Sequence, residues 1–268
     1  MLTFKKTYTF TIIMENKDSI LYAQLLQAKS ENRKLLAVLL DPDKIVWESL
    51  DHLILKINQS PATHIFIGGS LVKNNILDDL IVKIRQDCDL PIVLFPGNPS
   101  QISNKADAIL FLSLISGRNP DFLIEHQVQA APILKKTQLE IISTGYILVG
   151  SGTETAVECI SKTKPLDRNN LNLALATAQA GEMLGHKLIY LEAGSGAKQA
   201  IPLKMIALVS QNIEIPLLVG GGIVSLQGIE NAYKAGADLV VIGTAFENNL
   251  EFFNFDKILS CIFVYFLF

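Results

Sequence analysis

Cysteine and charged residues are both scarce in this chain. Its 268 residues include three cysteines, Cys88, Cys159 and Cys261, and no two of them are spaced as a CxxC pair. This spacing argues against a disulfide framework and against a cysteine zinc site, so we expect reduced thiols in a cytoplasmic protein. Charged residues make up 18% of the chain and the net charge is −3, which excludes the basic surface that a nucleic acid would need.

Several common catalytic and membrane signatures are also missing. The chain contains no GxSxG, Walker A or GxGxxG motif, and its four histidines share no spacing suited to a metal or a triad. Residues 2–13 contain Lys5 and Lys6 and no clear cleavage site, so they do not predict a signal peptide. The uncharged segment Ile258–Phe268 has eleven residues. A helix of that length spans about 16 Å, too short for a bilayer core of about 30 Å, and we expect it to be the last element of the fold.

Short apolar runs alternate with helical patterns along most of the chain. The expected strands are Leu35–Leu40, His64–Ile67, Ile92–Phe95, Ala108–Leu112, Leu139–Thr144, Leu188–Leu191, Ile215–Val219 and Leu239–Ile242. The expected helices are Asp18–Asn32, Ile45–Gln59, Leu71–Gln86, Asp121–Lys135, Asn170–Leu184, Leu203–Gln211 and Leu226–Ala235. Runs that are apolar throughout are typical of parallel strands buried on both faces.

Eight strand-then-helix units predict an α/β protein with a (β/α)8 TIM-barrel fold. A doubly wound open sheet is the alternative. We expect an N-terminal extension and helix over residues 1–33, the barrel over residues 34–250 and an apolar tail over residues 251–268.

One of the eight units lacks room for its helix. Only eleven residues separate Phe95 from Asp107, and they include Pro96, Gly97 and Pro99. Prolines and glycine leave at most one helical turn there, so the third helix is predicted to be reduced to a loop. The resulting gap in the outer ring would let an elongated ligand leave the barrel sideways. A shortened loop without a role is the alternative.

Turns of small residues follow three successive strands near the end of the chain. They are Gly194-Ser195-Gly196, Gly220-Gly221-Gly222 and Gly243-Thr244. Glycines let backbone N–H groups face an anion without a side chain in the way. A single turn of this kind is usually just a tight turn, but three in succession indicate one shared phosphate site.

Four side chains at strand ends are candidates for chemistry. Tyr190 and Glu192 lie on the same face of one strand, beside the phosphate turns, where Glu192 could accept a proton and Tyr190 donate a hydrogen bond. Asp41 and Ser70 follow the first two strands, and a carboxylate with a hydroxyl can hold Mg²⁺ when waters and phosphates complete its shell. The competing interpretations are helix caps for Asp41 and Ser70 and an ion pair with Lys198 for Glu192. We expect Asp43 to be the helix cap in this segment and Asp41 to have no capping role.

Six motifs occur in order along residues 34–248. They are Leu40-Asp41-Pro42-Asp43-Lys44, Ile67-Gly68-Gly69-Ser70, Phe95-Pro96-Gly97, Tyr190-Leu191-Glu192-Ala193-Gly194-Ser195-Gly196, Val219-Gly220-Gly221-Gly222-Ile223 and Gly243-Thr244. Together they resemble the geranylgeranylglyceryl phosphate synthases and their heptaprenyl relatives. The resemblance implies a TIM barrel that joins sn-glycerol 1-phosphate to a prenyl diphosphate, geranylgeranyl in the first instance, as an ether, with Mg²⁺ as cofactor.

The resemblance also assigns roles to residues. Asp41 and Ser70 would be the Mg²⁺ ligands, and Tyr190 and Glu192 the catalytic pair. The glycerol-phosphate site would comprise Tyr190, Leu191, Glu192, Ala193, Gly194, Ser195, Gly196, Gly221, Gly222, Gly243 and Thr244. Some members carry a lysine two residues before the metal aspartate, where this chain has Leu39. That difference leaves the phosphate more dependent on backbone N–H groups.

Two other functions stay open at this stage. A phosphosugar isomerase or aldolase could use the same barrel, although no Glu–His pair or strand-end lysine is evident. A non-catalytic barrel that binds a phosphate ligand is the second alternative. For partners, we expect a homo-oligomer, no nucleic acid, and peripheral membrane contact for the lipid product.

Overall fold

The strands form where the sequence has uninterrupted runs of apolar residues. The computed structural model describes residues 20–69 and 76–253. Its strands are β1 (Leu35–Leu40), β2 (His64–Ile67), β3 (Ile92–Leu94), β4 (Ala108–Leu114), β5 (Glu140–Leu148), β6 (Leu188–Glu192), β7 (Leu217–Gly220) and β8 (Leu239–Ile242). All neighbours pair in parallel and β8 pairs with β1, so the sheet closes in chain order. The TIM barrel is confirmed, and the open-sheet alternative is wrong.

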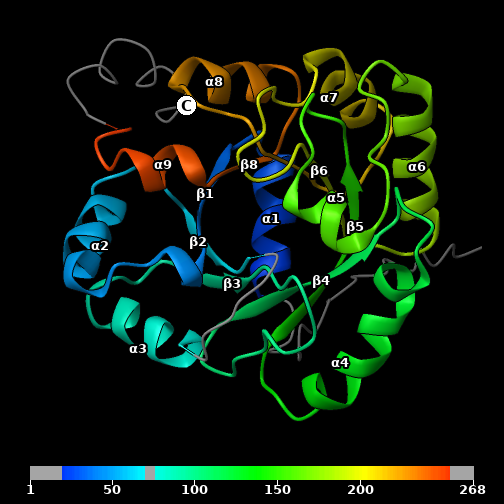
Figure 1. The fold of residues 1–268 in the computed structure, drawn as a ribbon. Coiled ribbons are helices and arrows are strands. Elements are labelled where there is room, and N and C mark those ends of the chain that lie inside the picture. The colour runs from blue at the N-terminus through cyan, green and yellow to red at the C-terminus, as the bar shows by residue number, and fades with distance from the viewer. Residues whose placement is uncertain (1–19, 70–75, 254–268) are drawn as a thin grey trace, which may run out of the picture.

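Helices surround the strands (Figure 1). They are α1 (Ile20–Ser30), α2 (Leu50–Asn58), α3 (Leu77–Asp87), α4 (His126–Leu134), α5 (Ala156–Ser161), α6 (Leu171–Met183), α7 (Leu203–Ser210), α8 (Leu226–Lys234) and α9 (Thr244–Asn248), with short helices η2 (Pro42–Lys44), η3 (Trp47–Ser49) and η4 (Asp121–Glu125). The sequence did not predict α5 or α9, because helices of six and five residues carry little periodic signal. None of the helices in the described ranges is long and apolar enough to cross a bilayer.

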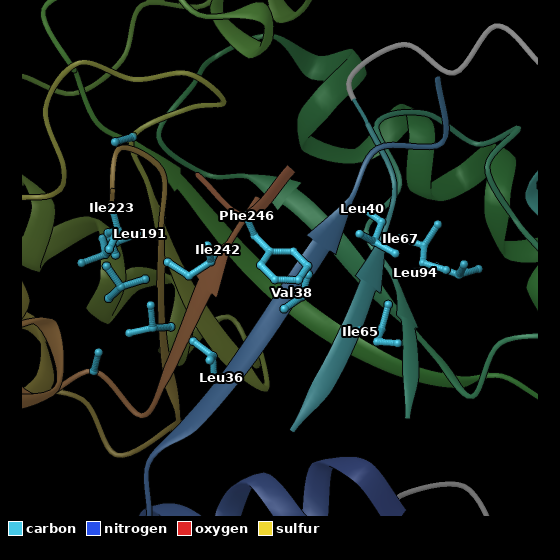
Figure 2. Close-up of a cluster of buried hydrophobic side chains, with 14 of the residues drawn as sticks. Leu36, Val38, Leu40, Ile65, Ile67, Leu94, Leu191, Ile223, Ile242 and Phe246 are labelled. Carbon is cyan, nitrogen blue, oxygen red and sulfur yellow. The ribbon is translucent and has the colours of Figure 1, made fainter. Parts of the chain in front are cut away.

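Alternate side chains of each strand pack into two separate cores. In β1, Leu36, Val38 and Leu40 point outward and pack beneath the helices with side chains from other strands, as Figure 2 shows. Leu35 and Ala37 point into the barrel and pack with its interior side chains. Because both faces are buried, the strands carry no polar alternation, which explains their continuously apolar sequences.

Helix α1 closes the amino-terminal end of the barrel. Its residues Leu21, Leu25 and Ala28 pack against the interior side chains of the strands. The buried Glu140 carboxylate accepts hydrogen bonds from the N–H groups of Leu21 at 2.7 Å and Tyr22 at 2.9 Å. The predicted helix at Asp18–Asn32 is therefore present as α1. The predictions for residues 1–19 and for the tail at Ile258–Phe268 lie outside the described residues.

The helix that would follow β3 is absent, as predicted. Residues 96–107 run from β3 to β4 without a helix. Gln101 is buried in this segment and connects it to the end of β2. Its side-chain amide accepts from the N–H of Gly97 at 3.2 Å and donates to the carbonyl of Gly69 at 2.9 Å. The segment therefore has a fixed path along the rim of the barrel.

Candidate active site

A cavity of about 620 Å³ opens at the carboxyl-terminal ends of the strands. Active sites of TIM barrels lie at this end, because the loops that follow the strands converge there. Its polar part is lined by Asp41, Lys44, Glu192, Gly194, Ser195, Gly196, Gly221, Gly222, Gly243, Thr244 and Glu247. Its apolar arm is lined by Pro99, Ile102, Phe111, Leu112, Phe122, Ala130, Val157 and Ile160. The cavity thus joins a polar chamber to an apolar arm, which runs toward the side of the barrel where no helix follows β3.

The three predicted small-residue turns meet in the polar chamber. The hydroxyls of Ser195 and Thr244 lie 3.3 Å apart, which brings the turns after β6 and β8 together. The backbone N–H groups of Ser195, Gly196, Gly221 and Gly222 have no acceptor within the described part of the chain. Unpaired N–H groups that line a cavity are suited to bind an anion, because a phosphate oxygen can accept the hydrogen bond that each of them lacks.

Glycine is required at two of these positions. Gly221 and Gly222 have φ values of +80° and +69°, a conformation that side chains disfavour. A Cβ atom on Gly221 would overlap the Glu192 carboxylate, and one on Gly222 would lie 2.8 Å from the Ala200 nitrogen. The turn after β7 therefore lies directly against the turn after β6, and no larger residue fits between them.

Glu192 ends β6 and is buried beneath the small-residue turns. Its Oε1 atom accepts a hydrogen bond from the Gly194 N–H at 2.7 Å, so this amide is already used by the protein. Burial raises the pKa of Glu192, and the neighbouring Tyr190 and the Gly194 N–H oppose the rise. No ion pair joins Glu192 to Lys198 in the described structure, so the ion-pair interpretation is wrong.

Tyr190 lies one layer deeper than Glu192. Its ring packs at 5.4 Å from Phe95 and 5.5 Å from Tyr146, measured between ring centroids. The Tyr190 hydroxyl lies near the Glu192 carboxylate and favours its charged form. The geometry is not that of a hydrogen bond, and the hydroxyl has no hydrogen-bond partner among residues 20–69 and 76–253. Burial raises the pKa of Tyr190 well above its ordinary value, so the hydroxyl keeps its proton and remains a donor.

The side chains of two predicted binding residues point away from the cavity. Leu191 and Ala193 alternate with Tyr190 and Glu192 along the strand, so their side chains point out of the barrel. Both pack in the core between the strands and the surrounding helices, where Figure 2 shows Leu191 beside Ile223. The N–H of Ala193 donates to the Gly220 carbonyl at 3.0 Å. Their side chains therefore support the strand rather than line the cavity.

Asp41 lines the cavity beside the turn after β8, and it also caps a helix. Its Oδ1 atom accepts a hydrogen bond from the Asp43 N–H at 3.2 Å, which makes Asp41 the N-cap of η2. The expectation that Asp43 caps this segment and Asp41 does not is wrong, because the chain turns immediately after Asp41. Ser70, the second predicted ligand, lies outside the described residues.

The donor set around Asp41 fits Mg²⁺ bound together with a substrate phosphate. Gly69 leaves the carboxylate room, since a Cβ there would lie 2.7 Å from Oδ1. The described ranges contain no group of three or more His, Cys, Asp or Glu side chains that could enclose a metal. Mg²⁺ commonly uses only one or two protein carboxylates and completes its octahedron with waters and phosphates.

Sequence reasoning missed two charged residues of the site. Glu247 in α9 accepts from the Asp41 N–H at 3.2 Å and from the Lys44 ammonium at 3.0 Å. Lys44 also lies 3.6 Å from Asp41 Oδ2. The available signal was a carboxylate one helical turn beyond the Gly243-Thr244 turn, but no helix was predicted there.

The chain is similar in sequence to proteins of one family. A model of the PcrB family matches residues 28–262. The chain is 72% identical over 234 residues to a geranylgeranylglyceryl phosphate synthase of Flavobacterium johnsoniae, covering 87% of this chain and 96% of that protein. It is 42% identical over 224 residues to the synthase of the same name from Pyrococcus furiosus, covering 83% of this chain and 88% of that protein.

A solved structure agrees with these relatives. The crystal structure of (S)-3-O-geranylgeranylglyceryl phosphate synthase from Thermoplasma acidophilum, in complex with substrate sn-glycerol-1-phosphate, superposes with a TM-score of 0.82 at 29% identity. The match covers 87% of this chain and 94% of that one. With a family match over most of its length, the chain belongs to the PcrB family.

Proposed function

We propose that this protein is a prenyltransferase that joins sn-glycerol 1-phosphate to a long prenyl diphosphate as an ether. The observation that carries the proposal is the two-part cavity. Unpaired N–H groups at Ser195, Gly196, Gly221 and Gly222 suit a phosphate, and an apolar arm of the same cavity suits a prenyl chain. The relatives named as geranylgeranylglyceryl phosphate synthases, and the Thermoplasma complex with sn-glycerol-1-phosphate, support this assignment.

The residues divide the reaction between them. The turns after β6, β7 and β8 hold the phosphate, and Glu192 and Tyr190 orient the glycerol 3-hydroxyl. The bond between prenyl carbon 1 and the diphosphate oxygen breaks, its electron pair leaves with diphosphate, and the glycerol oxygen bonds to carbon 1. Glu192 takes the hydroxyl proton. Positioning of the two substrates in one cavity supplies much of the rate enhancement.

Mg²⁺ is the proposed cofactor. Asp41 would hold it, with Ser70 as the second ligand that the family resemblance assigns. When bound, the ion neutralises charge on the departing diphosphate.

The apolar arm accounts for a preference for long chains. Each five-carbon unit buried there contributes at most about 4 kcal/mol, at roughly 0.8 kcal/mol per CH₂ group. Part of this is offset by the cost of ordering the chain. We further propose that the lipid product brings the protein to membrane surfaces and that it works as a homo-oligomer. Vesicle co-sedimentation and light scattering of the purified protein test these two points.

The alternative functions receive no support from the described site. A Schiff-base aldolase needs an unprotonated lysine at the carboxyl end of the barrel. Lys187 precedes β6 and lies over the Tyr22 ring at the opposite end. Lys44 lines the cavity, but its ion pairs with Glu247 and Asp41 favour the protonated amine. An isomerase needs a histidine beside its glutamate, whereas the described groups around the Glu192 carboxylate belong to Tyr190, Gly194 and Gly221.

Mass spectrometry of products tests the proposal. The purified protein is incubated with Mg²⁺, sn-glycerol 1-phosphate and C15, C20 or C35 prenyl diphosphate. We expect an ether product, formed most rapidly with C20, and formed far more slowly by the Glu192→Gln variant. Absence of product with every diphosphate would contradict the proposal and favour a non-catalytic barrel.

A further inference from the structure

Glu247 connects two functional groups at the edge of the cavity. One carboxylate oxygen accepts from the backbone N–H of Asp41 at 3.2 Å, and the other accepts from the ammonium of Lys44 at 3.0 Å. The Glu247 side chain is mostly buried, with 15% exposed, whereas 47% of the Lys44 side chain is exposed. A buried carboxylate therefore holds an exposed ammonium at a fixed place.

The position of this ammonium matters because of what else lines the cavity. Lys44 is the only lysine or arginine among the described residues that line it. Asp41, Lys44 and Glu247 occupy the edge formed by β1 and α9, beside the Gly243-Thr244 turn from which α9 begins. A prenyl diphosphate carries several negative charges next to an apolar chain. Among the described residues that line the cavity, Lys44 is therefore the cation available to its charged end.

We propose that Lys44 contacts the diphosphate of the prenyl donor and that Glu247 is its positioning residue. This proposal rests on the proposed function. The Lys44 ammonium has three N–H donors, of which Glu247 takes one and Asp41, with Oδ2 at 3.6 Å, attracts a second. A donor that remains bonds a diphosphate oxygen and stabilises the charge that the leaving group gains as its bond to carbon 1 breaks. Through the Asp41 N–H, Glu247 also fixes the turn that carries the Asp41 carboxylate.

Binding of inorganic pyrophosphate tests the role of Lys44. Calorimetry is done twice, with EDTA and with Mg²⁺, so that the lysine contact is measured without any metal. We expect Lys44→Met to weaken pyrophosphate binding about tenfold in both conditions, the size typical of a lost charge-assisted hydrogen bond. Lys44→Arg should recover part of the loss. The matched control is Lys83→Met, which removes the same charge from an ion pair with Asp51 outside the cavity.

A double-mutant cycle separates positioning by Glu247 from a general effect on folding. Glu247→Gln should raise KM for the prenyl diphosphate and leave KM for sn-glycerol 1-phosphate unchanged. In a Lys44→Met background it should add little, because the glutamine oxygen can still accept from the Asp41 N–H and the rest of its effect passes through the lysine. Pyrophosphate binding by Lys44→Met within twofold of the wild-type value, or fully additive effects in the cycle, would overturn the inference. If wild-type protein makes no ether product yet binds pyrophosphate through Lys44, the proposed function fails and the site stands.

Discussion

At the scale of single residues, Glu192 is the proposed proton acceptor, and its burial lowers the stability of the fold when the carboxylate is charged. Its carboxylate is buried, and burial raises its pKa, which makes it a better proton acceptor than an exposed glutamate. Glu192→Gln keeps an oxygen that can accept from Gly194 but cannot take a proton. We expect kcat to fall by about 10²–10⁴ while the Kd for sn-glycerol 1-phosphate changes only slightly. Steady-state kinetics and calorimetry check this, and a loss confined to binding would remove the proposed base.

The same burial predicts a pH effect on stability. In the folded state the pKa of Glu192 lies above its ordinary value of 4.5, so the folded protein binds more protons than the unfolded chain in the interval between the two. Stability is therefore highest below the ordinary value and falls as pH rises through the folded pKa. We expect Glu192→Gln to raise the Tm at pH 7 and to have little effect at pH 4. Thermal melts across this range measure it, and a variant that is less stable at pH 7 would contradict the prediction.

Gly221 offers a second test at this scale. A methyl group there would overlap the Glu192 carboxylate, and its φ of +80° disfavours any side chain. Gly221→Ala should therefore lower affinity for sn-glycerol 1-phosphate at least tenfold, because the turn must move away from Glu192.

The control for that variant is Gly185→Ala. Gly185 has a similar φ of +88°, but no atom lies within 4 Å of an added Cβ and it does not line the cavity. Both variants pay the backbone strain of order 1 kcal/mol. Only Gly221→Ala should lose binding, so equal affinities for the two variants would count against the phosphate site.

At the scale of elements, the segment without a helix depends on one glutamine. Gln101 bonds Gly97 within the segment and Gly69 at the end of β2, and Gly69 lies against Asp41. Gln101→Leu keeps the volume but leaves these backbone groups unpaired. We expect a loss of about 1–3 kcal/mol in the free energy of unfolding. KM for the prenyl diphosphate should also rise, and an unchanged KM would show that the segment does not shape the donor site.

The sequence predicted some elements better than others, for physical reasons. Strands such as β1 and β8 are buried on both faces, so their apolar runs mark them at every position. The short helices α5 and α9 bury few residues and leave no such record, and the site residue Glu247 was missed with α9. At Asp41, a local hydrogen bond to Asp43 decided the cap, which spacing alone does not reveal.

At the scale of the whole molecule, barrel closure brings the site together. The glycine turns are distant in sequence from Asp41, and β8 pairing with β1 places them around one cavity. The sequence predicted which strand ends carry polar groups, because all strands of a parallel barrel end on the same side. It did not predict that the Gly194 amide is used by Glu192, since that local bond depends on the conformation of the buried Glu192 side chain.

A crystal structure with bound sn-glycerol 1-phosphate tests the central claim most directly. We predict the phosphate oxygens within hydrogen-bond distance of the N–H groups of Gly196, Gly221 and Gly222, and the 3-hydroxyl on Glu192. A ligand bound elsewhere, with these N–H groups facing only solvent, would contradict the account.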